Sequence, residues 1–223
     1  KFNGMLLGGG FGRRGNRDLE FMVDSALLSK AVGKPVKVLW TREDDVKNGR
    51  FRPQYVNRIR AAVDDKGKIV AWHHRVVSDE ALAYMDPVRF KASQGRDNIA
   101  MRGTELPTYD IPHRLAEGLQ QPTGIRTAPL RAIGVGQNSF ANEVFIDEVA
   151  AKLGVDPVEF RIRQLAGTPR AQRGRDVLRE VARMAAWGRK REGRGLGVAY
   201  LDYSGTQLAG IAEVSLNKDG RIR

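Results

Sequence analysis

A short run of glycines near the start of the chain is the first feature that could do chemistry. Gly10-Phe11-Gly12-Arg13-Arg14-Gly15 fits the pattern G-x-G-x-x-G. It lies between a predicted strand that ends with Met5-Leu6-Leu7 and a predicted helix over Asp18 to Val32. Glycines let backbone N–H groups approach an anion, and the N-terminus of a helix is electropositive. An acidic residue about 20 positions later would complete a dinucleotide-binding pattern, but Glu43 and Asp44 come late. The pattern therefore indicates either an anion-binding loop or a tight turn from strand to helix.

The side-chain inventory narrows the chemistry further. The chain of 223 residues has no cysteine, which excludes disulfides, thiolate nucleophiles and iron–sulfur ligation within it. Its three histidines are His73, His74 and His113, and we predict no metal site from them. His73 and His74 lie on a predicted strand, where alternation directs their side chains to opposite faces. The net charge of +12 predicts an anionic partner, which could be nucleic acid, an anionic cofactor or an acidic subunit.

Regular elements must position the glycine loop. The helix over Asp18 to Val32 is followed by Gly33, which is placed to cap it. The pattern then predicts a short strand over Pro35 to Trp40 and a polar turn or helix start over Thr41 to Asp45.

The middle of the chain begins with a predicted hairpin, whose strands run over Tyr55 to Val63 and Lys68 to Ser78. Ala81 to Ile111 has no clear period and is predicted to be irregular surface, and Pro122 to Gln137 is predicted to be a loop. Asn138 to Leu153 is predicted to be an amphipathic helix. The residues expected to share its apolar face are Phe140, Val144, Phe145, Ile146, Val149 and Leu153.

The last third of the chain continues with helices and then strands. Asp156 and Pro157 are predicted to start a helix that runs to about Leu165. The elements predicted after it are a linker over 167–174, a helix over Asp176 to Trp187, antiparallel strands over Gly195 to Ser204 and Gln207 to Leu216, and a turn over 217–220. Because helices and strands do not alternate strictly, the predicted fold class is α+β, with mixed sheets and packed helices. We expect a division into residues 1–166 and residues 167–223.

Several motifs follow the glycine loop in a fixed order. They are Gly33-Lys34-Pro35-Val36-Lys37-Val38, Trp40-Thr41-Arg42-Glu43-Asp44-Asp45, Arg131-Ala132-Ile133-Gly134-Val135-Gly136-Gln137, Phe140-Ala141-Asn142-Glu143, Ile146-Asp147-Glu148-Val149-Ala150 and Gly154-Val155-Asp156-Pro157-Val158-Glu159-Phe160-Arg161. With the glycine loop, this set resembles the molybdopterin-binding subunit of the xanthine dehydrogenase and aldehyde oxidase family. The double arginine after the loop is most similar to the isoquinoline 1-oxidoreductase beta-subunit branch. The resemblance covers most of the chain and is weakest between about residues 79 and 115.

The resemblance implies a molybdenum–molybdopterin cofactor, expected as a cytosine dinucleotide, held by two loops at residues 8–14 and 131–137. The residues that carry over as cofactor-binding are Gly9, Gly10, Phe11, Gly12, Arg13, Arg131, Ala132 and Gln137. It also implies hydroxylation of an aldehyde or N-heterocycle with oxygen from water, and electron transfer to iron–sulfur clusters on a small partner subunit. We therefore expect a partial molybdopterin-binding-subunit architecture in which the two loops come together.

Some positions depart from the family pattern. Ile133 stands where the family usually has Pro or Phe. The family's catalytic glutamate lies in a glycine-rich segment near the end of the subunit, and no position of this chain matches it. Glu143, Glu148 and Glu213 are interpreted as surface or helix carboxylates. We therefore expect a fragment whose catalytic base lies outside the chain and which holds no metal ligand of its own.

Two other functional classes require patterns that this sequence lacks. A Rossmann-type NAD enzyme needs alternating strands and helices, whereas a hairpin is predicted after Trp40. A non-enzymatic basic module needs arginines gathered with exposed aromatic residues. The aromatic residues here are predicted to lie mostly on apolar faces, so no nucleic-acid partner is expected.

The missing glutamate predicts that the purified 223-residue chain, reconstituted with cofactor, oxidises neither aldehydes nor N-heterocycles above background. A dye-linked assay measures this, with the longer parent subunit as the control. Clear turnover by the chain alone would show that it contains a base of its own.

Overall fold

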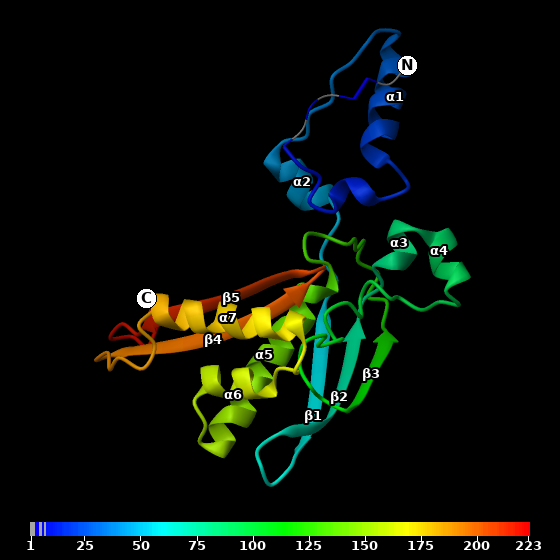
Figure 1. The fold of residues 1–223 in the computed structure, drawn as a ribbon. Coiled ribbons are helices and arrows are strands. Elements are labelled where there is room, and N and C mark those ends of the chain that lie inside the picture. Colours follow the sequence, from blue (N-terminus) through cyan, green and yellow to red (C-terminus); the bar gives the residue numbers. More distant parts are fainter. Residues whose placement is uncertain (1–2, 5, 7) are drawn as a thin grey trace. The chain divides into compact units, whose positions relative to one another are not determined.

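The computed structural model describes residues 3–4, 6 and 8–223. These residues form two compact units that interleave along the chain. Unit 1 comprises Lys1–Val56, Val76–Arg102 and Gly118–Gly134, and unit 2 comprises Asn57–Arg75, Gly103–Glu117 and Val135–Arg223. Three of the five boundaries fall within the strands of one sheet, which pair in the order β1 (Tyr55–Val63), β2 (Ile69–Ser78), β3 (His113–Gln120) (Figure 1). The predicted strand end at Met5-Leu6-Leu7 includes residues outside the described set, and the predicted division near residue 166 stays a prediction.

Unit 1 contains a 3₁₀ turn and short helices joined by loops. They are Arg13–Gly15, α1 (Glu20–Val32), α2 (Arg42–Asn48), α3 (Leu82–Met85) and α4 (Pro87–Ala92). The α1 helix ends where Gly33 adopts a φ of 68°, which confirms the predicted cap. The α2 helix begins with a capping box, in which the Thr41 hydroxyl accepts a hydrogen bond from the Asp44 amide and the Asp44 carboxylate accepts one from the Thr41 amide. The sequence therefore predicts the end of α1 and the start of α2 correctly.

Two predictions for unit 1 are wrong. Pro35 to Trp40 forms no strand, because none of the described residues pairs with it. Ala81 to Ile111 is not irregular surface, since it contains α3 and α4 and buries several apolar residues. These helices are too short to show a helical period of apolar residues in the sequence. Hydrogen bonds from backbone amides to side chains determine where they begin. The Asp97 carboxylate accepts hydrogen bonds from the amides of Ala81 and Leu82, at 2.7 and 2.8 Å.

Unit 2 contains three helices, parts of strands β1 to β3 and a β-hairpin. Its helices are α5 (Gly134–Leu153), α6 (Pro157–Gln164) and α7 (Pro169–Met184). The Asp156 carboxylate accepts hydrogen bonds from the amides of Val158 and Glu159, at 2.9 and 3.0 Å, which confirms the predicted start of α6.

The predicted linker over 167–174 and the predicted helix over 176–187 are wrong in their bounds. The α7 helix begins at Pro169, because the Thr168 hydroxyl caps it by accepting a hydrogen bond from the Ala171 amide. Gly174 therefore lies inside the helix, where a Cβ atom would come within 2.5 Å of the Tyr200 hydroxyl oxygen. Close packing, rather than a linker, explains this glycine.

Strands β4 (Arg194–Tyr203) and β5 (Thr206–Ser215) form the predicted antiparallel hairpin, and α7 packs along it (Figure 1). Ser204 and Gly205 join them with φ angles of 51° and 82°, as a type I′ turn requires. Strand β3 was not predicted. Most of its residues are exposed on both faces, so the sequence shows no alternation there.

The core of unit 2 lies between the sheet, the helices and β4. Trp72 of β2 meets Phe145 of α5 edge to face, with ring centroids 5.4 Å apart. The predicted apolar face of α5 is wrong in part, because Phe140, Val144 and Leu153 are exposed. The residues of α5 that are buried include three polar ones, Asn138, Asn142 and Glu143.

A fully buried arginine explains why Glu143 lies on this inner face. The Arg161 guanidinium on α6 donates to the Glu143 carboxylate at 2.8 Å and to Asp147 at 2.5 Å. The Glu143 carboxylate also accepts hydrogen bonds from the Tyr109 hydroxyl at 2.9 Å and the Tyr200 amide at 2.8 Å. Glu143 is therefore a buried structural anion: of the two interpretations, helix carboxylate is confirmed and surface carboxylate is wrong.

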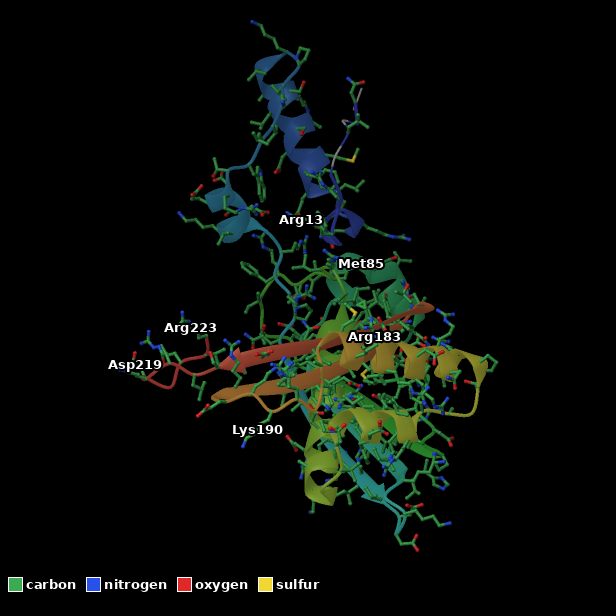
Figure 2. The ribbon with its side chains drawn as sticks, turned by 60° about the vertical axis from the view of Figure 1, so that its left-hand side comes forward. Arg13, Met85, Arg183, Lys190, Asp219 and Arg223 are labelled. Atoms are coloured by element: carbon green, nitrogen blue, oxygen red, sulfur yellow. The ribbon has the colours of Figure 1, made fainter. Side chains whose placement is uncertain are left out.

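Many of the arginines in the last third of the chain lie on solvated helix faces. On α7, Arg179 pairs with Asp176, and Arg183, which is labelled in Figure 2, pairs with Glu180. These side chains are largely exposed. Exposed pairs of this kind contribute only about 0–1 kcal/mol each. None of the helices among the described residues has the length and apolar character that crossing a membrane requires.

The two adjacent histidines face opposite sides of the sheet, as predicted. His74 is fully buried, and its Nε2 atom lies 2.8 Å from Oδ1 of Asn57. Burial lowers the pKa of His74 to about 4. His73 lies on the other face, with Nε2 2.5 Å from the Glu117 carboxylate. Both side chains therefore contact protein groups.

The lowered pKa of His74 predicts a loss of stability in mild acid. His74 stays neutral in the folded chain, whereas in the unfolded chain it takes up a proton below a pKa of about 6.5. The free energy of unfolding should therefore fall by up to about 3 kcal/mol as the pH falls from 6.5 towards 4. Urea unfolding across this range measures the slope, which should be shallower in His74→Gln. Equal slopes would contradict the prediction.

Candidate functional site

The glycine loop has a backbone that few other residues could adopt. Gly9 and Gly12 have φ angles of 138° and 91°, and Phe11 between them has a φ of 47°. The loop closes when the Arg13 amide donates to the Gly10 carbonyl at 2.9 Å. A non-glycine residue at positive φ is strained by about 1–3 kcal/mol and persists only where surrounding contacts hold it. The conformation of Phe11 therefore depends on what packs against the loop.

A second loop provides that contact. The Arg131 amide donates a hydrogen bond of 2.9 Å to the Phe11 carbonyl. The two loops also approach closely, because a Cβ atom on Gly12 would lie 2.2 Å from the Pro129 carbonyl oxygen and 2.9 Å from Cα of Leu130. All of these residues belong to unit 1. The structure thus brings the glycine loop together with residues 129–131, as predicted. The predicted loop over 131–137 is wrong in its end, because α5 begins at Gly134.

The second loop is itself strained. Ala132 and Ile133 have φ angles of 73° and 52°, two consecutive non-glycine residues in the left-handed region. The Ile133 amide donates to the Leu130 carbonyl at 2.7 Å. The Ile133 side chain packs against a small apolar cluster around Leu82 and Ile99. Ile133 therefore has a packing role within unit 1.

An arginine from another segment holds this turn. The Arg52 guanidinium donates from Nη2 to the Arg131 carbonyl at 2.8 Å and from Nη1 to the Ile133 carbonyl at 3.3 Å. The neighbouring residue, Phe51, exchanges backbone hydrogen bonds of 2.9 Å with Arg126 and Ala128. Sequence reasoning missed Arg52, since no motif marks it.

The two arginines after the glycine loop have protein contacts. Arg13, labelled in Figure 2, donates from Nη1 to the Glu20 carboxylate, and its guanidinium lies 5.9 Å from the centre of the Trp40 ring. Burial lowers the pKa of Arg13, and its Nε atom is buried without a hydrogen-bond partner among the described residues. The Arg14 guanidinium stacks over the Phe21 ring at 4.2 Å.

Hydrogen-bond donors dominate the joined loops. Among the described residues, the amides of Gly9, Phe11, Gly12 and Ala132 have no acceptor. The Arg131 side chain is exposed and has no ion-pair partner within the same set. Neither residues 8–14 nor residues 129–134 include a carboxylate. Free amides, an unpaired guanidinium and a missing negative charge together fit an anionic ligand that bears phosphate groups.

Gln137 lies in the first turn of α5 and belongs to unit 2. Its Oε1 atom is buried and has no hydrogen-bond partner among the described residues. An unpartnered buried acceptor is uncommon in proteins and needs an explanation. Whether it contacts a ligand stays a prediction.

The other carboxylates weighed in the sequence lie outside these loops. Glu213 pairs with Arg191 and Arg194 at 3.1 and 3.0 Å, so it is a structural carboxylate of β5. Glu148 is exposed on α5, as interpreted. No group of three or more His, Asp or Glu side chains within the described part of the chain gathers in the way that would hold a metal ion.

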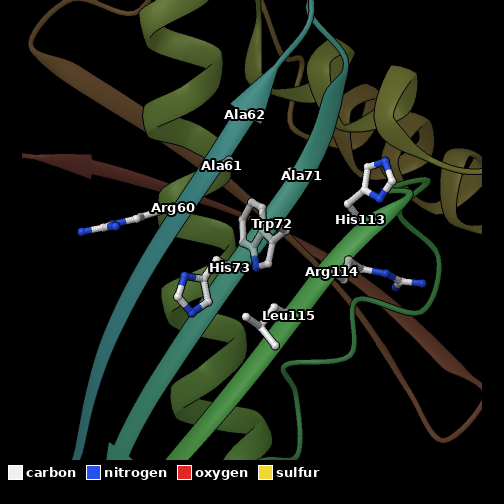
Figure 3. Close-up of a pocket in the computed structure, with 9 residues that line it drawn as sticks. All are labelled: Arg60, Ala61, Ala62, Ala71, Trp72, His73, His113, Arg114 and Leu115. Atoms are coloured by element: carbon white, nitrogen blue, oxygen red, sulfur yellow. The ribbon is translucent and has the colours of Figure 1, made fainter.

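Unit 2 carries a separate hollow of about 430 Å³ on the β1–β2–β3 sheet. Ala61, Ala62 and Ala71 lie on its strands, with His73, Leu115 and His113 beside them (Figure 3). The surface of the hollow is mainly apolar, and no motif in the sequence predicts it. It contains no carboxylate and shares no residue with the two loops.

Comparisons with known proteins agree with the resemblance. A family model described as the molybdopterin cofactor-binding domain matches residues 4–165. The chain is 39% identical over 218 residues to isoquinoline 1-oxidoreductase subunit beta of Brevundimonas diminuta, covering 96% of this chain and 27% of that protein. It is 34% identical over 203 residues to a membrane-bound aldehyde dehydrogenase of Gluconacetobacter polyoxogenes, named with pyrroloquinoline-quinone, covering 82% and 26%.

A solved structure shares the fold. Quinoline 2-oxidoreductase from Pseudomonas putida 86 superposes with a TM-score of 0.69 at 23% identity, over 87% of this chain and 27% of that chain. This likeness supports the α+β architecture. The chain spans about a quarter of the length of each of these proteins.

The close approach of the two loops predicts that Gly12→Ala destabilises unit 1 by roughly 2 kcal/mol, since the added methyl group meets backbone at a positive φ. Gly15→Ala is the matched control, because open space surrounds Gly15 and its φ is not positive. It should change stability by less than about 0.5 kcal/mol. Urea unfolding measures both, and equal stabilities would show that the loops do not pack this closely.

Proposed function

The chain belongs to the molybdopterin cofactor-binding domain family of molybdenum hydroxylases, and from this premise we propose that its two joined loops hold the cofactor. The observation that carries the proposal is the 2.9 Å hydrogen bond from the Arg131 amide to the Phe11 carbonyl. It joins two segments that are about 120 positions apart in the sequence, and both bear the family's motifs. The proposed activity is that of a longer subunit, of which this chain is a part.

The proposed ligands are mainly backbone groups. The amides of Gly9, Phe11, Gly12 and Ala132 supply donors whose direction is set before a ligand arrives, so binding requires little reorganisation. The Arg131 guanidinium supplies an exposed positive charge, and Arg13 brings a buried Nε donor that has no partner among the described residues. Gln137 belongs to unit 2, and its orphaned buried atom is the acceptor Oε1, so its contact with the cofactor stays a prediction of the family resemblance. Gly10 allows the chain to turn tightly between these donors. This donor set suits phosphate and pyranopterin acceptors.

When bound, a molybdenum–molybdopterin cofactor supplies the two-electron oxidation of the substrate carbon. We propose its cytosine dinucleotide form, because the net charge of +12 and the donor-rich loops suit a ligand with several phosphates. The proposed reaction is hydroxylation of an aldehyde or an N-heterocycle with oxygen from water. The names of the two relatives, an isoquinoline oxidoreductase and an aldehyde dehydrogenase, support both substrate classes.

The electrons released in this reaction need an acceptor that the chain does not provide. It has no cysteine, so iron–sulfur clusters require another polypeptide or another segment. We propose a small iron–sulfur subunit as the partner. The relative from Brevundimonas diminuta is itself named as a beta subunit, which supports an assembly of several chains.

The fold favours this proposal over a Rossmann-type dinucleotide protein. That alternative requires a strand directly after α1, to pair beside the strand that precedes the glycine loop. Residues 35–40 have no regular structure, and the next strands, β1 and β2, form a hairpin. The glycine pattern is therefore better explained as a cofactor loop of the molybdopterin-binding type.

A substitution at Arg131 tests the proposed site. In the parent subunit, Arg131→Ala should lower molybdenum content or activity at least about tenfold, which corresponds to roughly 1.4 kcal/mol. The melting temperature of the cofactor-free protein should change little, because the side chain is exposed and unpaired among the described residues. Metal analysis, turnover and thermal unfolding together separate these effects.

Arg42→Ala serves as the matched control, because it removes an exposed guanidinium whose one ion pair within the described part of the chain is with Asp45 on α2. It should leave molybdenum content and turnover unchanged. If Arg131→Ala also keeps normal molybdenum content and normal turnover, Arg131 is not part of a cofactor site.

A further inference from the structure

Arg52 reaches the second loop from a distant part of the sequence. The backbone hydrogen bonds of Phe51 with Arg126 and Ala128 fasten the Arg52 segment beside that loop. From there, the guanidinium donates to two carbonyls that flank Ala132, at 2.8 Å to Arg131 and 3.3 Å to Ile133. Only a planar fork with several N–H donors can reach both carbonyls at once in fixed geometry.

Holding these carbonyls fixes the direction of the following amides. In a trans peptide the C=O and N–H bonds lie in one plane and point in opposite directions, and the described residues include no cis peptide. The hydrogen bond from Arg52 to the Arg131 carbonyl therefore turns the Ala132 amide away from Arg52. No acceptor for this amide exists among the described residues.

The same argument extends to the glycine loop. The Arg131 amide binds the Phe11 carbonyl at 2.9 Å, and this hydrogen bond turns the Gly12 amide away from the contact between the loops. A series of contacts thus leads from Arg52 through Arg131 to Phe11. It fixes two free amides, those of Ala132 and Gly12, on two different loops.

We propose that Arg52 is a positioning residue for cofactor binding, which clamps the left-handed turn at Ala132 and so aims the Ala132 and Gly12 amides at the anionic ligand. This inference rests on the proposed function of the two loops. Both hydrogen bonds of the Arg52 side chain to the described residues go to backbone carbonyls, so its effect on the ligand passes through the peptide planes. A simple charge effect would be reproduced by lysine, whereas a clamp on two carbonyls would not.

The test compares Arg52→Lys and Arg52→Ala with the wild type in the parent subunit. Molybdenum content should fall about tenfold in both variants, because lysine keeps the charge but cannot hold both carbonyls. Hydrogen–deuterium exchange supplies a second readout. In the wild type, loading with cofactor should protect residues 129–134, and in both variants this protection should fall at least about threefold. Exchange of α6 and α7 should stay unchanged.

Arg126→Ala is the matched control, since it removes another guanidinium of unit 1 that donates to a backbone carbonyl, that of Asn48 at 2.7 Å. It should keep wild-type molybdenum content and protection. Full retention of both by Arg52→Lys would overturn the clamp, and so would equal losses in Arg126→Ala. A wild-type subunit that binds no molybdenum would instead refute the proposed function itself.

Discussion

The buried guanidinium of Arg161 is the interaction on which unit 2 depends. A charged group that is buried away from water must be paired and hydrogen-bonded, and here the Glu143 carboxylate forms an ion pair with the Arg161 guanidinium. Burial acts to lower the pKa of Arg161, but Glu143, Tyr109 and Asp147 together outweigh burial and raise that pKa, so the guanidinium stays protonated. Burial raises the pKa of Glu143 in turn. Because Glu143 also binds Tyr109 and Tyr200, a single ion pair joins α5, α6, β4 and the loop before β3. Losing one partner of such a pair typically destabilises a protein by about 3–5 kcal/mol.

The sequence predicts an element well where neighbouring residues determine its ends or its turn. Caps such as Asp156 before α6, and the tight turns of the two hairpins, depend on a few neighbouring residues. The inner face of α5 depends instead on Arg161, which lies on another helix. A hydrophobic pattern cannot show that Glu143 is buried, because its burial depends on an ion pair with Arg161. For this reason the pattern places Phe140 on the buried face, although Phe140 is exposed. Strand β3 could not be predicted for a related reason. It pairs with β2, but its sequence shows no alternation of apolar and polar residues.

The candidate site shows the same division between local and distant causes. Its glycines and the Arg131 motif are visible in the sequence, because backbone at positive φ restricts residue choice. The clamp from Arg52 is invisible there, because it acts on carbonyl oxygens that every residue possesses. The strain of Ala132 and Ile133 is likewise a property of the assembled turn. In this unit, conformations that individual residues disfavour are maintained by contacts between segments, and the loops gain free donors as a result.

The interleaving of the two units sets an order of events during synthesis. Unit 1 is built from three stretches of chain, and its glycine loop is translated about 120 residues before the segment that supports it. At about 5–20 residues per second, the ribosome needs on the order of ten seconds to cover that interval. During this time Phe11 has no Arg131 amide to bind, and closing so long a loop carries an entropic cost. The nascent loop therefore stays open until residues 129–134 emerge. Both donor loops can engage a ligand together only after most of this chain has left the ribosome.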